Sequence, residues 1–125
     1  MSDVVYGQRW NSTVRFIIDH VSVDDARKRY TDGPWFSVAV GAGLCTDFDE
    51  AWAARAAGVS LPVPEFSLEL EARATAVRAL FYDTHGSITV LHDWRVKDDR
   101  LFLETVLFYT YPDEPRFHVQ NESLR

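Results

Sequence analysis

The residues best suited to chemistry are three in succession, His92-Asp93-Trp94. They belong to an alternating apolar run, in which a strand would place His92 and Trp94 on one face and Asp93 on the other. A histidine on an apolar face is commonly a hydrogen-bonded core residue. Burial and a nearby carboxylate also bring its titration close to neutral pH, which suits a general base. His92 is therefore the first candidate catalytic residue.

A second histidine, His20, ends an early apolar run beside Ile18. In a cone-shaped sheet, His20, His92, Trp94 and Tyr109 would meet at the mouth, with Asp19 or Asp93 as the acid. Trp94 and Trp35 would supply flat apolar contacts to a ligand. This grouping is typical of a small cofactor-free isomerase, cyclase or lyase.

Motifs for phosphates and metals are weak. Gly41-Ala42-Gly43 lies between a strand and a helix, where a phosphate loop would lie. The acidic residues that follow it would repel a phosphate. The four histidines lack the short spacings of metal ligands, and Cys45 offers no second thiol. We expect no metal and no cofactor, and we interpret Cys45 as a small buried hydrophobe.

Acidic residues gather in two places that favour docking on a basic protein surface. One is a ladder on one face of a strand, and the other lies at the start of a helix: Glu65, Glu69 and Glu71, and Asp47, Asp49 and Glu50. Opposite charge on a partner would speed association with either cluster. The leading hypothesis is thus a non-catalytic protein-interaction module: an inhibitor, immunity-type or accessory subunit. The pocket enzyme remains the alternative.

Composition limits the classes of partner and the compartment. The net charge is -6 and no dense basic run occurs, which argues against nucleic acid or an anionic membrane as a partner. One cysteine, no apolar run behind a basic start and no stretch long enough for a bilayer predict a cytoplasmic protein. The length of 125 residues, without a linker, predicts one domain over 1–125.

The elements that must position these residues follow from periodicity and from capping residues. Ser22 and Thr46 begin the two helices as caps, and Gly33-Pro34 and Gly58 end them. The expected segments are an arm (1–12), a strand (13–21), a helix (22–31), a strand (35–40), a helix (46–58), an extended connector (61–64), a strand from 65, a hairpin (87–96 and 101–111) and a tail (112–125).

The segment from Glu65 to Ala76 alternates apolar and polar residues, which predicts one long strand. Its alanine-rich second half has a helical propensity. A bend or bulge near 76–78 would let the strand continue to Tyr82.

These elements predict an α+β fold in the order β-α-β-α-β-β-β. Two helices would pack on one face of a curved, mostly antiparallel sheet of about five strands. The architecture resembles cystatin-like and nuclear-transport-factor-2-like folds, although those usually begin with a helix and this chain with a strand. The final meander leaves a face or an edge to be covered, so a homodimer through the sheet is a further possibility.

Overall fold

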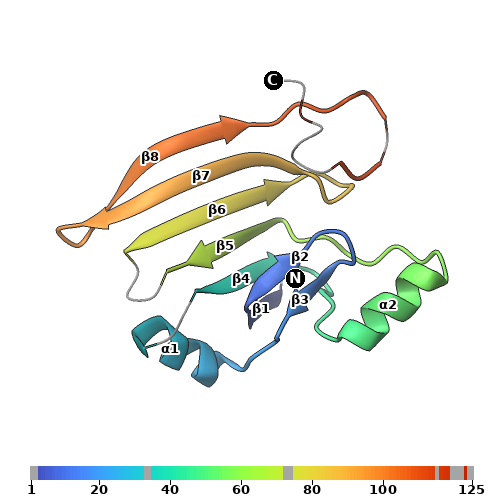
Figure 1. Ribbon diagram of the computed structural model, residues 1–125, viewed down its shortest axis with the longest axis horizontal. Helices are drawn as coiled ribbons and strands as arrows, with labels where there is room; N and C mark the ends of the chain where they lie inside the picture. The colour runs from blue at the N-terminus through green and yellow to red at the C-terminus, as the bar shows by residue number, and fades with distance from the viewer. Residues whose placement is uncertain (1–2, 33–34, 72–74, 115, 119–122, 124–125) are drawn as a thin grey trace.

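The computed structural model contains a six-stranded antiparallel sheet in the order β1-β4-β5-β6-β7-β8, a separate two-stranded sheet and two helices (Figure 1). The structure describes residues 3–32, 35–71, 75–114, 116–118 and 123. Among these residues, no helix is both long enough and apolar enough to cross a membrane.

The elements in chain order are β1 (Asp3–Gly7), β2 (Arg9–Asn11), β3 (Phe16–Ile18), α1 (Val23–Asp32), β4 (Phe36–Gly41), α2 (Phe48–Ala56), β5 (Phe66–Leu70), β6 (Ala76–Tyr82), β7 (Ile88–Lys97) and β8 (Arg100–Phe108). All neighbouring strands of the large sheet pair antiparallel.

Strand β4 defines the two faces of the large sheet, because its side chains alternate between them. Phe36 and Val38 pack against Ala26 of α1, so we call their side the helix face. Ala39 packs against Trp10 and Ile17 of the β2–β3 hairpin, so we call the opposite side the hairpin face. The first half of the sheet is thus enclosed between two layers.

The layer on the helix face stops near β5, whereas the hairpin cluster on the opposite face reaches Tyr82 of β6. α1 packs mainly on β1 and β4, and α2 packs on β3 rather than on the large sheet. Figure 1 shows both helices grouped at the β4 side of the molecule, with β6, β7 and β8 extending away from them. Most side chains of β8 are consequently exposed.

The α+β class, the two helices and the antiparallel sheet are confirmed. The helix expected at 22–31 is α1, where the Asp25 backbone N–H donates to Ser22 Oγ at 3.2 Å. Its expected stop, Gly33-Pro34, lies outside the described residues. α2 matches the second helix, although its N-cap is Asp47 rather than Thr46.

Three expectations about the first half of the chain are wrong. The arm at 1–12 contains β1 and β2, because Val4, Val5 and Tyr6 pair with β4 far along the chain. The strand at 13–21 shrinks to β3, since Asn11 Oδ1 accepts from the backbone N–H groups of 13 and 14 and forms a turn. The two helices do not share one face of the large sheet, because α2 packs on β3.

The predicted long strand after Glu65 is an antiparallel pair, β5 and β6. Both arms are extended as expected, but the chain reverses between Glu71 and Ala76, where the Glu71 N–H donates to the Ala76 carbonyl at 3.1 Å. Residues 72–74 of this connection are outside the described residues. The reversal also changes which residues face together, since Leu68 pairs with Ala79.

We expect Gly7→Ala to lower the free energy of unfolding by about 2 kcal/mol, through overpacking. An added Cβ would lie 2.5 Å from the Ile18 carbonyl oxygen and 2.6 Å from Ile17 Cγ1. Urea denaturation measures the loss. Gly58→Ala is the control: nothing lies within 4 Å, and only its φ of +72° adds strain, of about 1 kcal/mol. An equal or smaller loss at Gly7 would contradict this packing.

Candidate functional site

The candidate catalytic residues are spread across the molecule. His92 lies on the helix face of β7, and Asp93 points to the hairpin face, where it accepts from Arg78 Nε at 2.8 Å. His20 follows β3 and neighbours the bridge between Val21 and β1. Four strand spacings, about 19 Å, separate β1 from β7, and His20 lies beyond β1, so His20 and His92 are far apart.

Tyr109 also lies apart from His92. Its backbone N–H donates to the Thr89 carbonyl at 2.9 Å, which extends the β7–β8 pairing by one residue. Alternation from Val90 then assigns Tyr109 to the hairpin face, opposite His92. Its ring stacks on Tyr111 at 6.5 Å instead. Among the described residues, a shared His–Asp–Tyr pocket is therefore not assembled.

His92 belongs to a row of aromatic rings across β5, β6 and β7 on the helix face. Centroid distances are 6.1 Å from Phe66 to Phe81, 5.1 Å from Phe81 to His92 and 6.2 Å from His92 to Trp94. The sequence placed His92 and Trp94 on one face, and this is confirmed. The row is a continuous series of ring contacts across the three strands.

The two aromatic ligand candidates, Trp35 and Trp94, line one hollow at the end of β6. Its volume of about 190 Å³ is below the roughly 300 Å³ at which small-molecule sites begin. Trp35 is 49% exposed, so the hollow leaves half of its surface in solvent.

The acidic ladder is largely compensated by neighbouring groups. Glu69 lies opposite Arg78 in the register, and Glu71 accepts from Thr75 Oγ1 at 2.8 Å. A hydrogen bond to Asp93, together with the charges of Asp93 and Glu69, raises the pKa of the Arg78 guanidinium. Glu65 precedes β5 and is exposed. Of the three ladder residues, Glu69 thus lies opposite a cation, Glu71 accepts a hydrogen bond from an uncharged side chain, and Glu65 is exposed.

The acidic cluster on α2 has a different environment. Asp47 acts as the N-cap, with Oδ1 accepting from the Asp49 N–H at 3.3 Å. Asp49 and Glu50 are exposed, and neither forms an ion pair with any residue that the structure describes. They remain uncompensated carboxylates beside the first turn of the helix.

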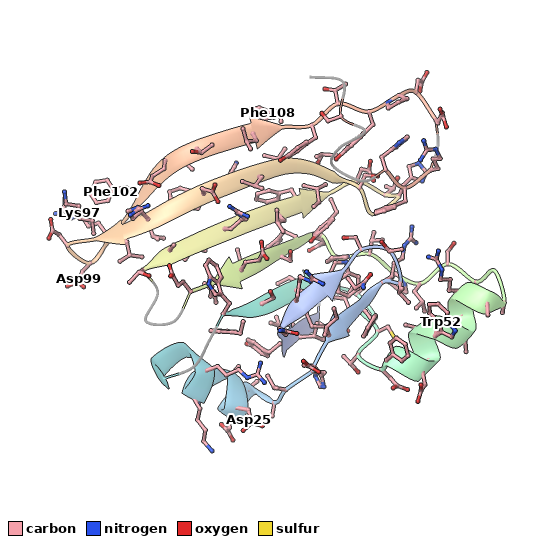
Figure 2. The ribbon with its side chains drawn as sticks, viewed as in Figure 1. Asp25, Trp52, Lys97, Asp99, Phe102 and Phe108 are labelled. Atoms are coloured by element: carbon pink, nitrogen blue, oxygen red, sulfur yellow. The ribbon has the colours of Figure 1, made fainter. Side chains whose placement is uncertain are left out.

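Trp52, labelled on α2 in Figure 2, forms an exposed aromatic pair with Phe48 of the same helix. Phe48 and Trp52 are 55% and 54% exposed, and their rings stack at 6.1 Å and 15°. The edge of Phe48 meets Phe16 at 5.6 Å, which anchors the pair to β3. The fully buried contact of the helix is Ala51 rather than this pair, because β3 is only three residues long.

A cleft of about 300 Å³ lies between the β2–β3 hairpin and the C-terminal segment, lined by Trp10, Asn11, Phe117 and His118 among others. The His118 backbone N–H donates to Ser87 Oγ at 2.7 Å, and its ring stacks on Tyr111 at 5.1 Å. The expected polar tail at 112–125 therefore docks in part. The adjacent aromatic residues Phe117 and His118 are the sequence signal for this docking.

Comparisons with known proteins found no match: no family model, no curated protein and no solved structure is similar to this chain. The resemblance to cystatin-like and nuclear-transport-factor-2-like folds therefore has no support from a neighbour. Any functional conclusion for this chain therefore rests on its own geometry.

A buried hydroxyl pair joins β5 to β6, since Ser67 Oγ and Tyr82 Oη lie 2.7 Å apart and Ser67 is 1% exposed. Burial raises the pKa of Tyr82 from 10.0 to about 12. The folded chain therefore keeps the phenolic proton in a range where the unfolded chain releases it. This stabilisation is complete below pH 10 and is lost as the pH rises towards about 12.

We expect Tyr82→Phe to cost about 1–2 kcal/mol at neutral pH, because Ser67 loses its partner. The variant should also lose less stability than the wild type between about pH 10 and about 12, by about 2 kcal/mol. Denaturant titrations at several pH values measure both effects, and Ser67→Ala completes a double-mutant cycle. If the free energy of unfolding falls equally with rising pH in wild type and in Tyr82→Phe, the raised pKa of Tyr82 is refuted.

Proposed function

We propose that this chain is a non-catalytic protein-interaction module that docks on a basic surface of a partner protein. The observation that carries the proposal is the exposed Phe48–Trp52 pair beside the uncompensated Asp49 and Glu50. Aromatic side chains supply much of the binding energy at interfaces when a partner removes them from water. A polar rim around such a centre is the usual arrangement.

The charge of this surface favours a cationic partner. The chain carries a net charge of -6, which draws basic proteins towards it and repels acidic ones. An arginine or lysine of the partner can pair with Asp49 or Glu50 and lie against the exposed indole of Trp52. Asp47 contributes less, because its carboxylate is engaged as the helix cap.

The docking contact is assigned to α2 rather than to the acidic ladder, whose Glu69 and Glu71 face Arg78 and Thr75. An inhibitor, an immunity-type protein and an accessory subunit all fit a rigid, acidic surface of this kind. The alternative of a pocket enzyme lacks the meeting of His20, His92 and Tyr109 that its chemistry requires.

Trp52→Ala and the double variant Asp49→Asn/Glu50→Gln are expected to weaken binding of a basic partner by about 10-fold or more. The partner is recovered from source cells at low salt, and its affinity for purified variants is measured by calorimetry. Binding should also weaken as salt rises, because exposed ion pairs are screened.

Asp24→Asn/Asp25→Asn on α1 is the matched control, because it also removes two negative charges, but from another exposed helix. This control should keep nearly all of the affinity. A partner that binds Trp52→Ala as tightly as wild type, or that loses equal affinity with the control, would refute the α2 surface.

A further inference from the structure

The helix face of β6, β7 and β8 is apolar throughout. Following the register from Val38 through Leu68 and Ala79 assigns to this face the residues Val77, Ala79, Phe81, Val90, His92, Trp94, Val96, Leu101, Leu103, Val106 and Phe108, which we call the outer face. None of these side chains carries a formal charge with histidine neutral. No described helix packs on them: Ala79 is buried among its neighbours in the sheet, most of the others are half-buried, and Leu101, Leu103 and Phe108 are 56%, 46% and 65% exposed.

The opposite side of the same strands is mixed: Leu80 and Leu91 are buried on it, and charged pairs lie farther along the strands. Arg78 bonds Asp93 at 2.8 Å, and Arg95 bonds Glu104 at 2.9 Å. An antiparallel sheet with one charged and one apolar side normally packs the apolar side on a core. Here the hairpin face has a buried section at Leu80 and Leu91, whereas no described layer covers Leu101, Leu103 and Phe108 on the apolar side. Contiguous apolar surface of this kind marks a contact with another molecule.

The strand edge is less suited to association than the face. The register steps from Asp93–Thr105 to Trp94–Leu103, so Glu104 is an extra residue that bulges β8. Bulges and charged side chains on an edge strand obstruct pairing with a further strand. An occupant of this half of the molecule therefore meets the outer face rather than extending the sheet.

We infer that the occupant is a second copy of this chain, stacked outer face against outer face about a two-fold axis. Such an interface presents one surface to itself, so like charges within it would repel. The outer face has none, since the acids of α2 and the Arg78–Asp93 row lie elsewhere. Self-association therefore brings no like charges into contact, despite the net charge of -6 on each chain.

The basic partner proposed for α2 fits this face poorly. A lysine or arginine buried against it would lose its hydration without finding a carboxylate. The two surfaces differ in chemistry, and the inference therefore stands independently of the proposed function.

The size of the outer face sets the expected strength of the dimer. Three strands of about nine residues cover a flat footprint of about 14 by 30 Å, on the order of 400 Å². The protruding side chains add to this area. Stable interfaces bury about 800 Å² of accessible surface on each partner. An interface smaller than this is weak, so a monomer–dimer equilibrium is expected at micromolar concentrations, where it is measurable.

Sedimentation equilibrium of the full chain, from about 1 to about 300 μM, tests the inference. The wild type should change from monomer to dimer over this range. Leu103→Glu should raise the dissociation constant at least 10-fold, and Leu101→Glu provides a second variant should the first fail to fold. Thermal unfolding followed by circular dichroism verifies that each variant is folded.

Phe102→Glu is the matched control, because Phe102 is 47% exposed on the same strand but pairs with Arg95 on the hairpin face. It should dimerise like the wild type, as should Asp49→Asn/Glu50→Gln. A wild type that is monomeric throughout would overturn the inference. If Phe102→Glu weakens the dimer as much as Leu103→Glu, the inference is overturned in favour of association through the edge of β8. A monomer whose basic partner is lost through Leu103→Glu would overturn it in favour of that partner.

Discussion

An apolar sheet face has to be covered, and in this protein the chain covers only half of one. α1 and the β2–β3 hairpin enclose β4 and its neighbours, where Ala39 is fully buried and Phe36 nearly so. Beyond β5 the same apolar pattern continues over three more strands without a described layer on the helix face. The hydrophobic effect that stabilises the first half of the sheet is therefore unsatisfied in the second half of an isolated chain.

This constraint separates the molecule into surfaces of different chemistry. The hairpin face of the outer strands carries mutually compensated charges, and their helix face carries none. The uncompensated carboxylates and the stacked aromatic pair lie on α2, which packs on β3. A symmetric contact through the outer strands and a charged contact through α2 can thus exist together, because neither one needs the residues of the other.

Local signals were enough to predict the parts of the fold that depend on local interactions. Ser22 marked the start of α1, and alternation identified the β7–β8 hairpin together with the shared face of His92 and Trp94. Strand β1 could not be predicted from local sequence, because its residues form a strand only by pairing with β4. The reversal after Glu71 could not be predicted either, because the sequence there contains no glycine or proline, the usual turn residues.

The candidate site was harder to predict for the same reason. Periodicity shows which side of a helix or strand is apolar, but the tertiary arrangement decides whether anything covers that side. Trp52 has the pattern of a core residue and lies half in solvent, because β3 is too short to cover it. The acids at 47, 49 and 50 were correctly placed at a helix start, whereas the pairing of Glu69 with Arg78 depends on the unforeseen reversal. The measurement closest to the central claim is an isotope-filtered NOESY spectrum of mixed labelled and unlabelled chains. A dimer stacked through the outer face should give intermolecular cross-peaks from the methyl groups of Leu101, Leu103 and Val106. Their absence, or cross-peaks confined to Phe102 and its neighbours on the hairpin face, would contradict it.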